Sequence, residues 1–90
     1  MFSSKATEYG LLNASQRGDI QKVLFCLDYG INIDTQGAHG QTALHKSCGQ
    51  NQLEVTILLL DRNANIESRE RFNGYTPLHE AAHKGSRNSP

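Results

Sequence analysis

The sequence predicts an all-α helical repeat solenoid of about two and a half units, and two observations indicate it. Residues 40–45 (GQTALH) recur 34 positions later as residues 74–79 (GYTPLH). Residues 18–34 match residues 51–67 more weakly, at an offset of 33. A period of this length is typical of stacked repeat units, each of which buries its apolar face only against its neighbours. The units are expected at about residues 5–37, 38–71 and 72–85, the last one incomplete.

Two helices are predicted in the first unit, over residues 7–17 and 20–29. Gly18 ends the first helix, and Asp19 can cap the second by accepting a backbone N–H of its first turn. Gly30 is expected to end the second helix, because glycine adopts the positive φ of this position without a steric penalty. The second helix has an apolar stripe at helical spacing, formed by Ile20, Val23, Leu24 and Leu27.

In the later units we expect helices over residues 42–50, 53–62 and 76–84. Thr42 and Thr76 are predicted N-caps, since a threonine hydroxyl can accept a backbone N–H that the first turn leaves unpaired. Pro77 would occupy the first helical position, where no N–H is needed. Asn63 holds the place of Gly30 one unit earlier and tolerates the same left-handed conformation.

The third unit has a predicted first helix only, because residues 86–90 (SRNSP) are polar and contain a proline. We expect them to form a disordered tail. The array would then leave Leu58, Leu59, Leu78 and Ala82 without a covering helix. The sequence is therefore either a segment of a longer array or a truncated chain without a function of its own.

These segments resemble the ankyrin repeat family, whose unit begins G-x-T-P-L-H-x-A-A-x-x-G. Residues 74–85 (GYTPLHEAAHKG) fit every fixed position of this pattern, and residues 40–67 cover a whole unit with softer fits. The resemblance extends over about residues 5–85. It implies an ankyrin-type solenoid in which the connectors 34–41 and 67–75 form short β-hairpin fingers. It also implies non-catalytic protein–protein recognition within an intracellular scaffold, adaptor or regulatory protein.

The composition favours a protein partner over other ligand classes. Nine basic residues balance nine acidic ones, which argues against nucleic acid and against an anionic membrane surface. Residues 1–5 lack the apolar core of a signal peptide, and the longest apolar run, residues 57–60, is too short to span a membrane. We expect an intracellular protein, cytoplasmic or nuclear, in which Cys26 and Cys48 are reduced thiols.

The resemblance also implies which residues contact a partner, at the finger around its glycine and late in the first helix of each unit. The aromatic pair Phe72 and Tyr75 has the make-up of an interface anchor. Two alternatives remain: Phe72 could fold back on its own finger, and Leu24 with Ile57 could form an apolar stripe on the opposite, convex face. The candidate protein-binding residues are Ala38, His39, Gln41, Gln50, Phe72, Asn73, Tyr75, His83 and Lys84.

Chemistry other than binding has little support in the sequence. His45 with Cys48, and His79 with His83, are spaced as zinc ligands could be on one helix face. However, the resemblance gives His45 and His79 a structural hydrogen-bonding role. No G-x-S-x-G, H-E-x-x-H or phosphate-loop pattern is present. We therefore expect no catalytic residues, no metal, no cofactor and no small-molecule substrate, with a metal-dependent enzyme fragment as the remote alternative.

Overall fold

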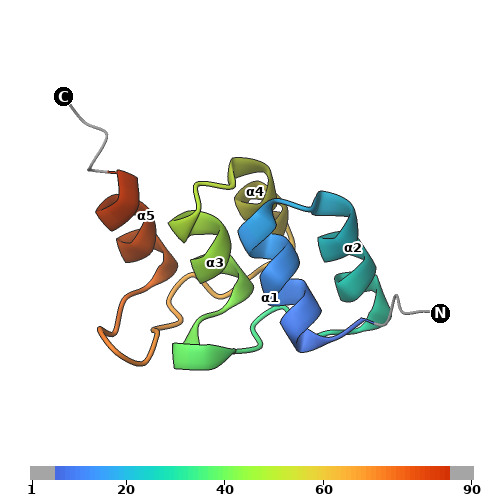
Figure 1. Ribbon diagram of the computed structural model, residues 1–90, viewed down its shortest axis with the longest axis horizontal. Coiled ribbons are helices and arrows are strands. Elements are labelled where there is room, and N and C mark those ends of the chain that lie inside the picture. Colours follow the sequence, from blue (N-terminus) through green and yellow to red (C-terminus); the bar gives the residue numbers. More distant parts are fainter. Residues whose placement is uncertain (1–5, 86–90) are drawn as a thin grey trace.

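The computed structural model describes residues 6–85, without the side chains of residues 83–85. Helices α1, α3 and α5 stand side by side in one row, and α2 and α4 form a second row behind it (Figure 1). Consecutive units thus stack as helix pairs, which confirms the all-α repeat fold. The elements are α1 (Glu8–Arg17), α2 (Ile20–Tyr29), the one-turn 3₁₀ helix η1 (Ala38–Gly40), α3 (Ala43–Gly49), α4 (Leu53–Asp61) and α5 (Pro77–Gly85).

Each helix of the front row begins at a threonine. The Oγ1 atoms of Thr42 and Thr76 accept the backbone N–H three residues further on, at 3.3 Å in both cases. Thr7 makes the same bond at the start of α1, at 2.8 Å. Pro77 is the first residue of α5, and Asp19 caps α2 by accepting from the N–H of Lys22. The sequence-based caps are confirmed.

Residues with a left-handed backbone conformation follow the helices at positions 33 residues apart, as the repeat offset requires. Gly18 and Asn51 have φ of 80° and 59°, and Gly30 and Asn63 have φ of 111° and 67°. Asparagine is among the few residues other than glycine that adopt this conformation readily. The backbone therefore follows the 33-residue offset even where the residue type changes.

The fingers are loops in this structure, and the expected β-hairpins are wrong in that detail. No strand is present in the described residues 6–85. In the first finger the Gly37 N–H donates to the Gln41 carbonyl at 2.8 Å, and the Gly40 N–H donates back to the Gly37 carbonyl at 3.0 Å. In the second finger the Glu70 N–H donates to the Tyr75 carbonyl at 2.8 Å, and the Gly74 N–H donates back to the Glu70 carbonyl at 3.1 Å. Strand pairing needs a ladder of such bonds. The Arg71 N–H instead donates across to the neighbouring finger.

The offset between units is 33 up to residue 67 and 34 from residue 74, so the second finger has one residue more than the first. The closing bonds locate this extra residue. Four residue steps separate Gly37 from Gln41, and five separate Glu70 from Tyr75. The insertion therefore lies at the finger tip, between Glu70 and Tyr75. Here the Arg71 N–H donates to the His39 carbonyl at 2.6 Å, which joins the two fingers.

The core lies between the two rows of helices. Leu59 is fully buried there, so the expectation that it lacks a covering helix is wrong: its side chain belongs to the same cluster as Val55 and Cys26. Leu78 is 76% exposed and Ala82 is exposed, as expected. The buried apolar residues are Ala6, Leu11, Leu12, Ala14, Val23, Cys26, Ala43, Leu44, Val55, Leu59 and Ala64. The predicted disordered tail, residues 86–90, lies outside the described residues.

Candidate protein-binding surface

His45 fixes the second finger to the second unit. Its Nδ1 accepts the Thr42 N–H at 3.2 Å, and its backbone N–H donates to the Thr42 hydroxyl. Its Nε2 lies 2.7 Å from the Tyr75 carbonyl oxygen. Because a carbonyl only accepts, Nε2 carries the proton, and both ring nitrogens are used. His45 is 1% exposed, so these bonds form in a site shielded from water.

Tyr75 is held from two sides. Its carbonyl accepts from His45, and its ring stacks on His79 with centroids 5.6 Å apart and planes inclined by 21°. The residue is half-buried. Tyr75 therefore lies at the base of the second finger, against α5, and its ring is not displayed at the tip.

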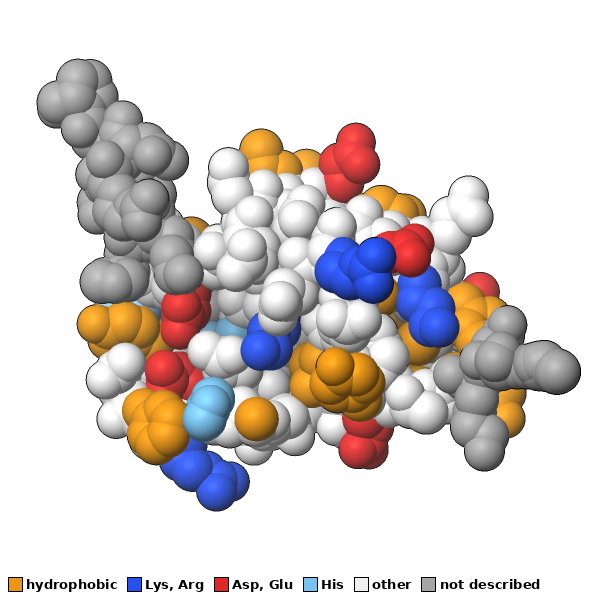
Figure 2. All heavy atoms as spheres, in the orientation of Figure 1, with side chains coloured by type: hydrophobic (Ala, Val, Ile, Leu, Met, Phe, Trp, Pro, Cys, Tyr) orange, Lys and Arg blue, Asp and Glu red, His pale blue; other side chains and the backbone are white. Residues whose placement is uncertain are grey.

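Phe72 is the aromatic residue at the tip. It is 72% exposed, and its ring packs on His39 of the preceding finger, with centroids 4.5 Å apart. It thus bridges two fingers, which differs from the alternative in which it folds back on its own finger. Figure 2 shows hydrophobic, histidine and basic side chains gathered at the lower left, where the finger loops lie in Figure 1.

The finger tip is held in shape by a buried carboxylate. Glu70 is 6% exposed, and its Oε1 accepts the Asn73 N–H at 2.7 Å. The Asn73 backbone thus closes the tip, while its side chain is exposed. His39 has a positive φ of 63°, which is uncommon for a residue other than glycine. The tip is a defined shape, with Ala38, His39, Phe72 and Asn73 exposed on it.

Two further candidates face a polar depression of about 160 Å³ between the front helices. Gln41 comes from the first finger, and Gln50 directly follows α3. Lys46 and the largely buried Glu80 line the same depression. It offers amide, ammonium and carboxylate groups, the types that pair with peptide backbone and polar side chains.

A second depression, of about 400 Å³, lies between α1, α3 and the first finger. Ala38 lines it, together with Tyr9, which is 77% exposed, and Lys46. Sequence reasoning missed Tyr9, Lys46 and the nearby Gln16. The repeat offset could have found Gln16, because it corresponds to Gly49 one unit later, next to the predicted Gln50.

Seven of the nine predicted residues can be placed. His39 contacts Phe72 at the tip, Gln41 and Gln50 share a depression, and Tyr75 lies apart from both groups. His83 and Lys84 belong to α5, but their side chains lie outside the described residues.

Metal-ligating side chains do not gather in the described part of the chain, where no group of three or more His, Cys, Asp or Glu residues could hold an ion. Cys48 is half-buried, and this burial raises the pKa of its thiol, against the opposing hydrogen bonds from Thr56 and Ser47. The thiol is thus protonated at neutral pH. Among the described residues there is also no helix with the length and hydropathy to cross a bilayer.

Comparison with known proteins agrees with this geometry. A family model described as "Ankyrin repeats (3 copies)" matches residues 11–89. The chain is 34% identical over 71 residues to "Serine/threonine-protein kinase 12" of Arabidopsis thaliana, covering 79% of this chain and 15% of that protein. It is 35% identical over 72 residues to "Probable E3 ubiquitin-protein ligase XBOS32" of Oryza sativa subsp. japonica, covering 80% and 14%.

A shorter match is closer in identity. Over 44 residues the chain is 54% identical to human "Ankyrin repeat and KH domain-containing protein 1", which is 49% of this chain and 2% of that protein. The chain therefore spans only a small part of the length of the curated relatives it matches.

Proposed function

This chain belongs to the ankyrin repeat family, whose fold is a protein–protein interaction module, and from that premise we propose that it grips a partner protein across both finger tips and the adjoining front face. The observation that carries the proposal is the Phe72–His39 pair, a large exposed ring held between two fingers. Aromatic residues with fixed geometry are the usual anchors of protein interfaces.

The tip is suited to binding because it is ordered before a partner arrives. The bond between the His39 carbonyl and the Arg71 N–H joins the fingers, and Glu70 closes the second one. A preordered loop loses less conformational entropy on association, so more of the contact energy contributes to affinity. This organisation supports the tip as the centre of the interface.

The front face would extend the contact from the tip. The depression at Gln41 and Gln50 presents amide groups, with Lys46 and Glu80 beside them. These groups suit an extended or loop segment of a partner better than an apolar ligand. His83 and Lys84, late in α5, would continue this face, because in the 34-residue register they correspond to Gly49 and Gln50.

We assign the chain a non-catalytic role as part of an intracellular scaffold, adaptor or regulatory protein. Its nine basic and nine acidic residues favour a protein partner over nucleic acid. No cofactor is included in this proposal: of the possible zinc ligands in the sequence, His45 already has both ring nitrogens hydrogen-bonded.

The test compares two exposed aromatic residues on different faces. Phe72 is 72% exposed at the tip, and Tyr29 is 68% exposed on α2. A binding peptide is selected from a displayed peptide library, and its affinity for each variant is measured by calorimetry. Phe72→Ala should weaken binding by about 2 kcal/mol, or about 30-fold, while Tyr29→Ala should have little effect. The opposite ranking would move the interface to the convex side.

A second pair of variants tests the extent of the interface. Tyr75→Ala removes the ring that stacks on His79, and Asp61→Ala alters the far end of α4. We expect Tyr75→Ala to reduce affinity less than Phe72→Ala, because its ring is half-buried. Circular dichroism of each variant checks that the fold is retained. If only the Asp61 variant loses affinity, the convex stripe of Leu24 and Ile57 becomes the better site.

A further inference from the structure

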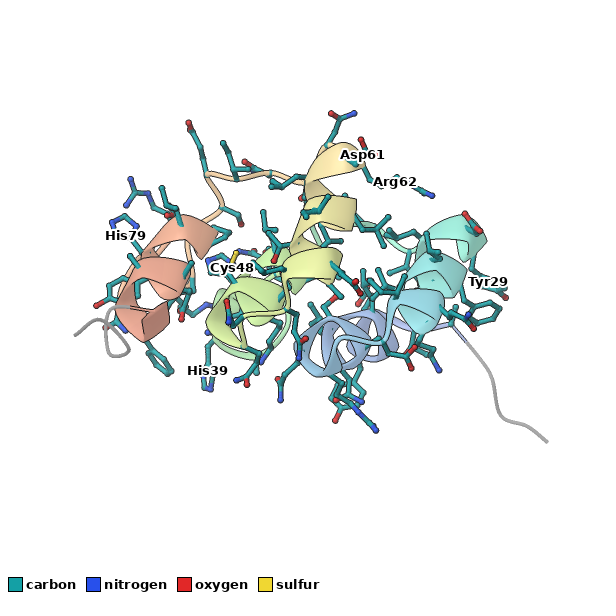
Figure 3. The ribbon with its side chains drawn as sticks, turned by 90° about the horizontal axis from the view of Figure 1, so that it is seen from above. Tyr29, His39, Cys48, Asp61, Arg62 and His79 are labelled. Carbon is teal, nitrogen blue, oxygen red and sulfur yellow. The ribbon has the colours of Figure 1, made fainter. Side chains whose placement is uncertain are left out.

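An apolar groove of about 620 Å³ lies on the rear side of the molecule, between α4 and α5. It is distinct from the finger tips and the front depressions. Figure 3 shows Cys48 within the space between these two helices. The side chains that make the groove apolar are those of Leu44, Cys48, Leu60, Ile66, Pro77 and Leu78.

The equivalent positions one unit earlier are covered by a helix. One unit earlier, the equivalents of Leu60, Ile66, Pro77 and Leu78 are Leu27, Ile33, Ala43 and Leu44. Those four are half-buried or buried, whereas Leu60, Ile66 and Leu78 are 45%, 57% and 76% exposed. Helix α4 packs on α2 and α3 at the earlier position. The groove therefore continues an existing helix-packing interface.

The residues that follow α5 do not repeat the sequence of α4. In the 34-residue register, Arg87 and Ser89 stand where α4 has Leu53 and Val55. Pro90 stands at the position of Thr56, whose N–H bonds to the Gln52 carbonyl at 2.9 Å. Proline has no N–H to make that bond. Residues 86–90 thus lack the apolar positions that seat α4.

We propose that this groove binds an amphipathic α-helix of another protein, which takes the place that α4 takes one unit earlier. In α4 the fully buried contacts are Val55 and Leu59, four residues apart. A partner helix should therefore carry two aliphatic residues at i and i+4 toward the groove. Helix-in-groove recognition of this kind uses an apolar face read at helical spacing.

Charged groups at the rim set the direction of that helix. Arg62, the residue directly after α4, lies 4.0 Å from Asp28 of α2, and Asp61 is the equivalent of Asp28 one unit later. A basic residue at i+7 of the partner would face Asp61 in the same way. The pair is exposed and adds little affinity, but it favours one orientation over its reverse.

A carboxylate near the finger side offers a second contact. Asp34 accepts the Asn65 N–H just after α4, at 2.8 Å. Glu67 is its equivalent, and within residues 6–85 its carboxylate makes no hydrogen bond. It is placed to accept a backbone N–H beyond the end of the partner helix. The binding sequence is thus an aliphatic residue at i and i+4 and a basic residue at i+7.

The probe for this site is a synthetic peptide with the sequence of residues 52–65 and the change Thr56→Val. The substitution is needed because Thr56 donates to the Ser47 hydroxyl, and the equivalent of Ser47 is Ala81. Binding is measured by fluorescence anisotropy with a labelled peptide. Alkylation of Cys48, followed by mass spectrometry, reports occupation of the groove, and saturating peptide should slow it by about tenfold.

Two exposed aliphatic residues give matched variants. Leu78 lines the groove and Ile57 does not, and they are 76% and 65% exposed, so neither is needed for the core. Leu78→Asp should weaken peptide binding by about 30-fold, and Ile57→Asp by less than about threefold. Phe72→Ala should leave peptide binding unchanged, which separates this site from the interface of the finger tips.

Several results would overturn the proposal. Equal binding to the Leu78 and Ile57 variants would mean that the peptide displaces α4 or binds elsewhere. Slow alkylation of Cys48 in the protein alone, with no peptide binding, would mean that the chain covers its own groove. Dimerisation that Leu78→Asp abolishes, seen by analytical ultracentrifugation, would make a second copy of the chain the occupant.

Discussion

The second and third units carry the same pattern of residues and make the same local bonds, yet they differ in burial. Thr42 with His45 and Thr76 with His79 form matching capping interactions, with the same 3.3 Å bond from the histidine N–H. The first pair is buried, with both residues at about 1% exposure, whereas His79 is exposed. Within the described residues 6–85, His45 alone of the two histidines bonds onward, to the Tyr75 carbonyl.

The same contrast holds for the leucines that precede the two histidines. Leu44 is 2% exposed and Leu78 is 76% exposed, although each stands at the second position of its helix. Leu44 has α4 packed on its helix, while the groove beside Leu78 is open. The comparison teaches that the repeat motif sets the helix start, and that the neighbouring unit sets how much the motif contributes to stability.

The largest expected difference concerns these leucines. Leu44→Ala should lower the free energy of unfolding by about 3 kcal/mol, because it leaves a cavity in the core. Leu78→Ala should change it by less than about 0.5 kcal/mol, as is usual at exposed positions. Urea unfolding followed by circular dichroism gives both values. Equal losses would show that Leu78 is covered in solution.

The histidines should differ next. His45→Ala is expected to cost about 2–3 kcal/mol, because it removes a bond between units and leaves the buried Thr42 N–H without its partner. His79→Ala should cost about 1 kcal/mol or less, since water can replace its bonds. Thermal unfolding of the two variants at one pH tests this. A larger effect of His79→Ala would contradict the comparison.

Alanine substitutions at the two finger glycines should differ less in their effect on stability. Gly40 and Gly74 both have positive φ, of 73° and 68°. An added Cβ at Gly40 would lie 3.1 Å from the Arg71 nitrogen, but at Gly74 nothing is within 4 Å. Gly74→Ala should therefore cost about 1 kcal/mol from the backbone conformation alone, and Gly40→Ala about 2 kcal/mol. Equilibrium unfolding of both variants measures the difference, which would vanish if the fingers separated in solution.

The smallest effect is a dependence on pH at Cys48, whose counterpart in the third unit is Ala82. Burial raises the pKa of the Cys48 thiol above its ordinary value of 9.0. The protonated thiol is thus favoured by folding, and its contribution is present below pH 9.0 and lost as pH rises through the folded pKa. Stability above that pH should fall less in Cys48→Ala than in the natural chain. Unfolding curves across this range compare the two, and parallel pH profiles would contradict the assignment.

The sequence was a good guide wherever a local rule applied. The caps at Asp19, Thr42 and Thr76 and the left-handed Asn63 were predicted because each depends on residues within one turn. Leu59 was misjudged because periodicity does not show toward which neighbour a helix face turns. The β-hairpins were wrong because the Arg71 N–H bonds to another finger, a contact that a pattern within one finger does not contain.

The candidate binding surface shows the same division. The sequence identified Phe72 and Tyr75 as aromatic residues of the second finger. It did not predict that one ring would be exposed and the other half-buried. Phe72 packs on His39, 33 residues away, with its ring tilted, and is exposed, whereas Tyr75 stacks on His79 and is half-buried. Which aromatic ring reaches a partner depends on packing between units, which residue spacing leaves open.

By itself the sequence determined the helical repeat, its period and the capping of α3 and α5, because hydrogen bonds and apolar spacing within a few residues decide these features. The tertiary structure alone decided which copy of the motif is buried, how Phe72 spans two fingers, and that a groove remains between α4 and α5. The physical reason is that burial depends on what packs against a residue, and in a stacked array that neighbour comes from another unit.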